Sequence, residues 1–227
     1  MKVLENLSVI ESEMKQACES SGRNISDIKL IAVTKYVSSE RTQEAINAGI
    51  EHIGENRLEG LLKKREEVSG NVQWHFIGSL QTRKVKDVID YVDYIHSLDR
   101  LSLAKEIQKR AKKPISCFVQ VNASGEESKH GLEPSKVIPF IKSLRSENLD
   151  LIKVVGLMTM APFTEDEKVL RNCFQTMKKL QDEVKSLNLE HAPCRELSMG
   201  MSNDFKLAIE EGSTFIRIGT ALVGDES

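Results

Sequence analysis

Short apolar runs, most of them rich in β-branched residues, alternate along this chain with longer stretches of helical periodicity. Apolar residues recur at helical spacing over residues 1–21, and Gly22 ends this first predicted helix. The pattern then predicts eight strands, at 28–34, 52–54, 72–77, 94–96, 115–121, 152–157, 195–198 and 215–218. Seven further helices are expected between them, at 38–48, 57–68, 84–90, 99–112, 134–146, 165–187 and 205–210.

Regular alternation of strand and helix is typical of a parallel sheet covered by helices. Eight such units, without a Gly-x-Gly-x-x-Gly turn after the first strand, favour a closed barrel over an open doubly wound sheet. We therefore predict an α/β fold, a (β/α)8 TIM-type barrel with an extra N-terminal helix. Residues 1–227 are expected to form a single domain, since barrels of this length often fold as one unit.

The composition narrows the class of protein. The chain has 227 residues and a net charge of −2. It therefore lacks the excess positive charge that is typical of proteins binding nucleic acid or anionic membranes. No apolar run reaches the ~18 residues of a membrane helix, and the N-terminus lacks the order of a signal peptide. No two cysteines have C-x-x-C spacing, so we expect reduced thiols and a cytoplasmic protein. The cysteines are Cys18, Cys117, Cys173 and Cys194.

Functional residues of such barrels lie at the C-terminal ends of the strands. The first predicted strand ends in Thr34-Lys35. A lysine at this place either extends to water or pairs with a carboxylate, or it serves as an amine in a partly desolvated site. Desolvation favours the neutral, nucleophilic form, which can form an imine with a carbonyl group.

The last two strands end in loops that suit a phosphate group. Ser198 and Ser202 offer hydroxyls around Gly200, and Gly219-Thr220 offers backbone N–H groups and a third hydroxyl. Arg217, on the last strand, has two interpretations: a structural ion pair, or a partner to the pyridine nitrogen of a cofactor. In the second case the ring nitrogen stays unprotonated, and the ring becomes a weaker electron sink.

Two further clusters are interpreted as structural. His52, His75 and His96 lie on three successive strands and could converge on a metal. No cysteine or carboxylate accompanies them at matching positions, so a polar layer inside the barrel is favoured and no metal site is predicted. The charge run Lys63 to Glu67 is expected to be a solvated helix face.

Several motifs strongly resemble the pyridoxal phosphate homeostasis proteins, single-domain relatives of the alanine racemase barrel. These motifs follow one another over nearly the whole chain. They are Ala32-Val-Thr-Lys35, Gly54-Glu-Asn56, His75-Phe-Ile-Gly78, Val121-Asn-Ala-Ser-Gly-Glu-Glu-Ser-Lys-His-Gly131, Gly156-Leu-Met-Thr-Met160, Ser198-Met-Gly-Met-Ser202 and Arg217-Ile-Gly-Thr220.

The resemblance implies pyridoxal 5′-phosphate as cofactor, with Lys35 as the Schiff-base lysine and Arg217 facing the pyridine nitrogen. It places Asn56 near the cofactor ring and Met199 beside it. The implied phosphate-binding positions are Ser202, Gly219 and Thr220, with Ser198 nearby. The chain departs from the family at Arg57 and Arg83, where members often carry Tyr and Asn.

A racemase of this barrel type needs a base on each face of the substrate, and in the resembling racemases the second base is a tyrosine from a further domain. We expect that domain to be missing, and we expect Tyr36 to point away from Lys35, as neighbours on an extended segment do. The favoured function is therefore binding, buffering and delivery of the cofactor, without catalysis.

Two alternative functions stay open at this point. One is a pyridoxal-phosphate-dependent racemase or related enzyme, and the other is a cofactor-free Schiff-base aldolase whose lysine attacks a sugar or keto-acid. Apo-enzymes that need the cofactor are the expected partners of a carrier. The resemblance suggests a monomer or a weak dimer.

Overall fold

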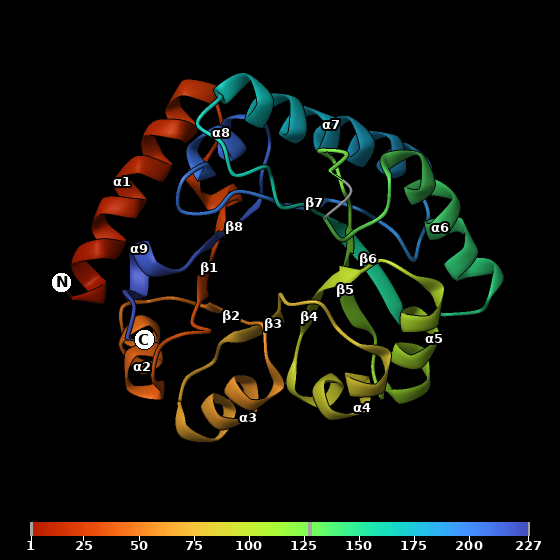
Figure 1. Cartoon of the computed structure of the whole chain (residues 1–227), viewed down its shortest axis with the longest axis horizontal. Helices are drawn as coiled ribbons and strands as arrows, with labels where there is room; N and C mark the ends of the chain where they lie inside the picture. Colours follow the sequence, from red (N-terminus) through yellow and green to blue (C-terminus); the bar gives the residue numbers. More distant parts are fainter. Residues whose placement is uncertain (1, 127–128, 227) are drawn as a thin grey trace.

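Eight parallel strands close into a barrel in which sequential strands are neighbours and β8 pairs with β1 (Figure 1). The computed structural model describes residues 2–126 and 129–226. The strands are β1 (Lys29–Val33), β2 (His52–Glu55), β3 (Gln73–Phe76), β4 (Tyr94–Leu98), β5 (Ile115–Gln120), β6 (Ile152–Met158), β7 (Glu196–Ser198) and β8 (Phe215–Ile218).

Helices surround this barrel, as Figure 1 shows. They are α1 (Val3–Ser21), α2 (Ser39–Asn47), α3 (Leu58–Glu67), α4 (Val85–Val88), α5 (Leu101–Arg110), α6 (Pro134–Ser146), α7 (Glu167–Ser186), α8 (Phe205–Glu210) and α9 (Thr220–Val223). The long α1 packs against α8, α9 and α2. It therefore covers the part of the barrel where the chain closes on itself.

The predicted fold class is confirmed, including the extra N-terminal helix, and each predicted strand is present. Two local expectations differ from the structure. The predicted helix 84–90 is one turn of α-helix flanked by short 3₁₀ turns, Thr82–Lys84 and Ile89–Tyr91. The short helix α9 was not predicted, because four residues are too few to show helical periodicity.

The barrel interior is packed rather than hollow. Its apolar part is a small buried cluster of Ile31, Phe118, Met158 and Phe215. The main hydrophobic core lies outside the barrel, between the strands and the helices, and the four cysteines are buried and unpaired. Because all strands run parallel, their C-terminal ends meet at one end of the barrel, where the candidate site lies.

Within the described residues, no helix combines the length and the apolar character that crossing a membrane requires.

Candidate functional site

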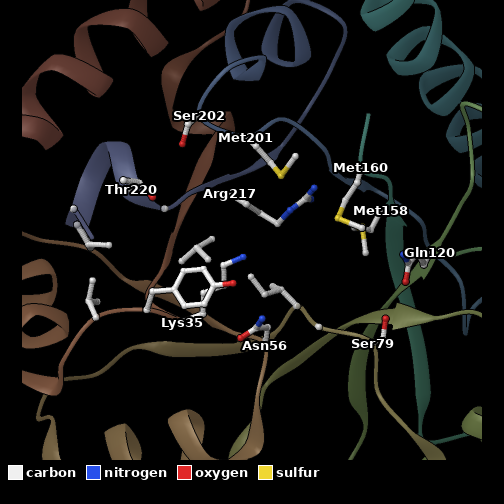
Figure 2. A pocket seen from close by; sticks show the side chains of 18 residues that line it. Lys35, Asn56, Ser79, Gln120, Met158, Met160, Met201, Ser202, Arg217 and Thr220 are labelled. Carbon is white, nitrogen blue, oxygen red and sulfur yellow. The ribbon is translucent and has the colours of Figure 1, made fainter. Parts of the chain in front are cut away.

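A cavity of about 400 Å³ lies at the C-terminal ends of the strands. This volume is in the range of small-molecule sites, about 300–1,000 Å³. Figure 2 shows polar side chains on or just after β1, β2, β7 and β8, with Met158 and Met160 on the opposite side of the cavity. The lining residues are Val33, Lys35, Tyr36, Val37, Asn56, Ile77, Gly78, Ser79, Gln120, Met158, Met160, Met201, Ser202, Arg217, Gly219, Thr220, Val223 and Gly224.

Six of the seven predicted cofactor-binding residues line this cavity, and Ser198 does not. Ser198 is fully buried, with its hydroxyl behind the Arg217 guanidinium. Met199, expected beside a ring, is also fully buried and does not line the cavity; Met201 does. The six lining residues are Lys35, Asn56, Ser202, Arg217, Gly219 and Thr220.

Lys35 differs in two ways from its expected setting. Its side chain is exposed rather than desolvated. The expectation that Tyr36 points away is wrong, because the Lys35 Nζ atom lies 4.7 Å from the centre of the Tyr36 ring. The cause is local: β1 ends at Val33, and Lys35-Tyr36 forms a turn in which the alternation of an extended strand no longer holds.

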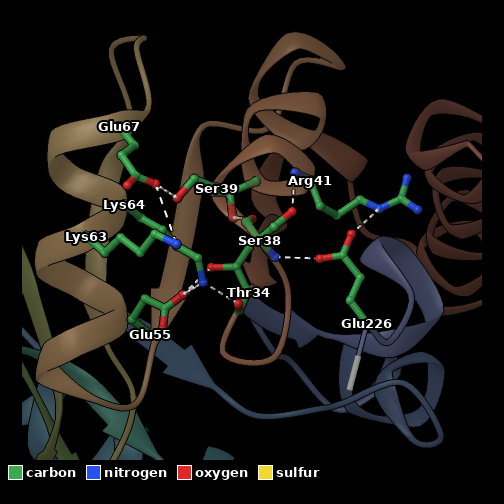
Figure 3. Close-up of polar contacts among 10 residues, drawn as sticks. Thr34, Ser38, Ser39, Arg41, Glu55, Lys63, Lys64, Glu67 and Glu226 are labelled. Atoms are coloured by element: carbon green, nitrogen blue, oxygen red, sulfur yellow. Dashed lines mark hydrogen bonds and ion pairs between the residues drawn. The ribbon is translucent and has the colours of Figure 1, made fainter.

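A buried charged cluster lies behind this turn, on the helix side of the strands (Figure 3). Lys64 of α3 donates to the Glu55 carboxylate at 2.6 Å and to the Thr34 carbonyl at 2.5 Å. The Thr34 hydroxyl donates to the same Glu55 oxygen at 2.6 Å. The prediction of a solvated charge run is therefore wrong for Lys64, which is 4% exposed.

The next residues of the β1–α2 loop are fixed from the C-terminal end of the chain. The Ser38 backbone N–H donates to the Glu226 carboxylate at 2.6 Å, and the Ser38 hydroxyl caps α2. Figure 3 also shows the ion pair between Arg41 and Glu226. Val37 and Gly224 both line the cavity. The contact between Ser38 and Glu226 therefore joins two segments of the cavity wall.

Arg217 is buried, and its guanidinium is held at two points. Nη1 donates to the Ser198 hydroxyl at 2.5 Å, and Nη2 donates to the Thr159 carbonyl at 2.8 Å. Burial lowers the pKa of Arg217 to about 10, and the charge of Asp204 partly offsets this. The guanidinium therefore stays protonated at neutral pH. Both hydrogen-bond partners are uncharged, so neither is the ion-pair partner that the sequence left open.

The loop after β7 is shaped by Gly200. Its φ is +96°, and a side chain there would place Cβ 2.7 Å from Cβ of Ala208. Glycine is thus required by both conformation and space. The Asp204 carboxylate accepts a hydrogen bond from the Met201 backbone at 2.5 Å. This tight turn holds Met201 and Ser202 at the cavity wall.

Asn56 gives the clearest sign that the cavity is built for a ligand. Its side-chain oxygen is buried and has no hydrogen-bond partner within the described residues. A buried polar atom without a partner is costly, and a ligand in the cavity can supply one. The approach of Gly78, whose Cβ would lie 2.5 Å from the Asn56 carbonyl, fixes the backbone here. With its amine, hydroxyls and guanidinium, the cavity fits a phosphorylated aldehyde.

Sequence reasoning missed the apolar wall of the cavity. Met158, the last residue of β6, is buried and lines the cavity. Met160 also lines the cavity and is 41% exposed. The available signal was their place at the C-terminal end of β6. Arg57 and Arg83 are not among the residues that line the cavity.

The three histidines of β2, β3 and β4 form a row rather than converging on one point. His52 Nδ1 lies 2.9 Å from His75 Nε2, and His75 Nδ1 lies 2.9 Å from His96 Nε2. Within the part of the chain that is described, no group of three potential ligand residues is arranged to hold a metal ion.

Comparison with known proteins gives the family of this chain. Residues 6–227 match the family described as alanine racemase, N-terminal domain. A pyridoxal phosphate homeostasis protein of Aquifex aeolicus is 43% identical, with 99% of each chain covered. A protein of the same name from Haemophilus influenzae is 34% identical, over 99% of this chain and 96% of that protein. This chain therefore belongs to the alanine racemase N-terminal domain family and, within it, to the pyridoxal phosphate homeostasis proteins.

Solved structures show the same architecture. PipY of Synechococcus elongatus, solved with PLP bound, has a TM-score of 0.82 and 27% identity, with 98% of this chain and 100% of that one covered. An alanine racemase of Clostridium difficile has a TM-score of 0.77 at 16% identity. That match covers 97% of this chain and 56% of the racemase, and it concerns the fold alone.

Proposed function

We propose that residues 1–227 act as one pyridoxal-phosphate-binding domain in which Lys35 holds the cofactor as a Schiff base. The observation that carries this proposal is the meeting of an amine, a buried guanidinium and two hydroxyls in one cavity of about 400 Å³. The relative PipY, whose structure is described as having PLP bound, supports the choice of ligand.

Lys35 supplies the covalent step. Its neutral amine adds to the aldehyde carbon, the C–N bond becomes a C=N double bond, and the aldehyde oxygen leaves as water. The exposed position of Lys35 lets the aldehyde and the departing water reach the amine. The neighbouring Tyr36 ring covers one side of the lysine side chain, which restricts the directions of approach.

The remaining residues bind and orient the ligand. The Ser202 and Thr220 hydroxyls and the backbone at Gly219 offer donors for the phosphate, with Ser198 behind them as a support of Arg217. Asn56 meets the polar edge of the ring. Arg217 is charged and buried, so it donates a hydrogen bond to the ring nitrogen without giving up its proton. A ring held in this way is a weaker electron sink.

These features favour a carrier that buffers and delivers the cofactor over an enzyme. Racemisation needs a base on each face of the substrate, whereas Tyr36 lies against Lys35 itself. The relatives are named homeostasis proteins. We propose apo-enzymes that require pyridoxal phosphate as partners, a cytoplasmic location, and a monomer or weak dimer as the state in solution.

Substitution of Lys35 tests the proposal directly. Purified protein given pyridoxal phosphate should turn yellow, and borohydride should bleach it and fix the adduct to the Lys35 peptide. Lys35→Ala should lose the fixed adduct, while Lys63→Ala, which removes an exposed lysine outside the cavity, should keep it. A wild-type protein that stays colourless after the addition overturns the proposal.

The carrier function is tested separately from binding. Loaded protein mixed with an apo-enzyme should restore that enzyme's activity, and loaded Lys35→Ala should release its cofactor faster. Racemisation of alanine by the purified protein at an enzyme-like turnover, on the order of 1 to 10³ per second, would contradict the carrier and favour an enzyme whose second base is still to be identified.

A further inference from the structure

The row of histidines continues to the cavity. His96 Nδ1 lies 3.0 Å from the Ser198 hydroxyl, which in turn accepts a hydrogen bond from Arg217. The links run from β2 through β3 and β4 to β7 and β8, across the barrel interior. The row begins at the half-buried His52 near the N-terminal end of β2 and ends at a residue that lines the cavity.

The direction of the hydrogen bonds in this row follows from the two contacts of the Ser198 hydroxyl. An arginine can only donate, so the Ser198 oxygen accepts. Within the described residues, His96 Nδ1 is the partner that can take the Ser198 proton. For the buried Ser198 proton to have this acceptor, His96 carries its own proton on Nε2 and donates to His75 Nδ1, and His75 in turn donates from Nε2 to His52 Nδ1. Every link is satisfied with neutral histidines.

We propose that His75, His96 and Ser198 are positioning residues for Arg217, joined in a one-way row of hydrogen bonds in which both histidines are neutral Nε2–H tautomers. The inference rests on the proposed function, since the guanidinium that they position is the one that meets the ligand's ring nitrogen. The two histidines act on Arg217 through Ser198. Because the Ser198 proton points to His96, a lone pair of the Ser198 oxygen is held toward Arg217.

The surroundings of the row keep it neutral. The His75 ring stacks on Tyr94 at 4.3 Å, and the His96 ring stacks on Phe118 at 4.3 Å. Both histidines are fully buried. Burial, joined by the charge of Arg217 at His96 and by the neighbouring histidines, lowers the pKa of each well below its ordinary value. A proton added to His96 would turn Nδ1 into a second donor toward Ser198 and break the direction of the row.

The tautomers can be measured in the ligand-free protein. Long-range ¹H–¹⁵N NMR of histidine-labelled protein at pH 7 should show His75 and His96 as neutral Nε2–H tautomers. A neutral Nδ1–H tautomer or a doubly protonated ring at either position overturns the inference. Because no cofactor is present, this outcome does not depend on the proposed function.

Two substitutions of His96 separate positioning from packing. In His96→Asn, the amide oxygen can take the place of Nδ1 and accept from Ser198, whereas His96→Gln reaches toward His75 and leaves Ser198 without an acceptor. A matched control is His191→Gln, at a buried histidine that bonds to the Ile141 carbonyl outside the row.

The readout is the ratio of dissociation constants for pyridoxal phosphate and its deaza analogue, in which C–H replaces the ring nitrogen. Wild type and His191→Gln should prefer pyridoxal phosphate by about tenfold to hundredfold, as expected for a hydrogen bond from a charged donor. His96→Asn should stay within about threefold of that ratio, and His96→Gln should lose most of it.

The outcomes separate the inference from the function on which it rests. A full ratio in His96→Gln overturns the positioning role, and so does a wild type that binds both ligands equally. A wild type that binds neither ligand overturns the proposed function, and the NMR measurement then still decides the direction of the row.

Discussion

Two cationic residues reach the same cavity from opposite ends of the sequence, and they are supported in different ways (Figure 2). The strand end before Lys35 is fixed by a charged pair, Lys64 with Glu55, buried between barrel and helix. Arg217 is held by uncharged groups inside the barrel, Ser198 and the Thr159 carbonyl. In the proposed function, the lysine that reacts with the ligand is exposed, whereas the arginine that orients the ligand is buried and held by hydrogen bonds.

The difference follows from what each support has to hold. The charged pair fixes backbone, because Lys64 binds the Thr34 carbonyl just before the lysine turn. This backbone anchor does not hold the Lys35 side chain, which is exposed. The uncharged row fixes a side chain, and it adds no second charge beside the guanidinium. Removing one half of a buried ion pair leaves a charge without its partner, which costs more than losing one neutral hydrogen bond.

The largest expected effect is therefore at Lys64. Lys64→Met leaves the Glu55 carboxylate buried without its partner and should lower the free energy of unfolding by about 3–5 kcal/mol. Urea unfolding followed by circular dichroism measures this. The exposed neighbour Lys63 is the matched control, and Lys63→Met should change stability by about 0.5 kcal/mol or less.

A double variant distinguishes a lost charge partner from lost packing. Glu55→Gln combined with Lys64→Met removes both charges, so it should recover part of the stability that Lys64→Met loses. Equal losses for Lys64→Met and Lys63→Met would show that the buried pair does not support the strand end.

The next effect is at Ser198, on the uncharged side of the comparison. Ser198→Ala removes the acceptor of a charged donor, so it should cost about 1.5–3 kcal/mol, less than Lys64→Met. Ser97 is an ideal control because it is a buried serine on β4 whose hydroxyl has no partner within the described residues. Ser97→Ala should be neutral or slightly stabilising. A Ser198→Ala loss as large as that of Lys64→Met would remove the distinction between the two supports.

The pH dependence of stability gives a third measure. The pKa values of His75 and His96 are lowered by burial in the folded protein, while unfolded histidine titrates near 6.5. Below that pH the unfolded chain binds protons that the folded protein refuses, so stability falls as pH falls. Each histidine contributes a slope of about 1.4 kcal/mol per pH unit.

His96→Asn removes the contribution of His96 to this slope, so the difference from wild type measures it. Its free energy of unfolding should fall less steeply than that of wild type between pH 6.5 and 5.5, by about 1 kcal/mol over that unit. Other groups near the row, such as Lys29 and Glu196 beside His52, are the same in both proteins. Identical slopes in the two proteins would mean that folding does not lower the pKa of His96.

The barrel could be predicted from sequence because parallel strands buried on both faces read as continuous apolar runs. The site residues at strand ends followed from that topology and from the family motifs. Lys64 could not be identified, because in a run of five charged residues any one can face the strands. The contact that selects Lys64 is made with Glu55, which is nine residues away.

The other errors have the same origin in tertiary geometry. Tyr36 was misplaced because the end of β1 falls one residue earlier than predicted, and a turn replaces the alternation of a strand. The three histidines were recognised as a set on successive strands, but the serine that completes the row is 102 residues beyond His96. Its role depends on barrel closure, which periodicity does not describe.

The smallest expected effect on stability is at Glu226, which holds the loop after Lys35 from the protein surface. Glu226 accepts from the Ser38 backbone and pairs with Arg41 at the surface, where solvent weakens such contacts. These bonds lower the pKa of Glu226. Glu226→Gln should change the melting temperature far less than Lys64→Met, yet it should speed release of the cofactor, because Val37 and Gly224 share the cavity wall. The release rate is measured by transfer of the cofactor to an apo-enzyme. If Glu226→Gln releases the cofactor at the wild-type rate, the Lys35-Tyr36 turn is held by the buried Lys64 cluster alone.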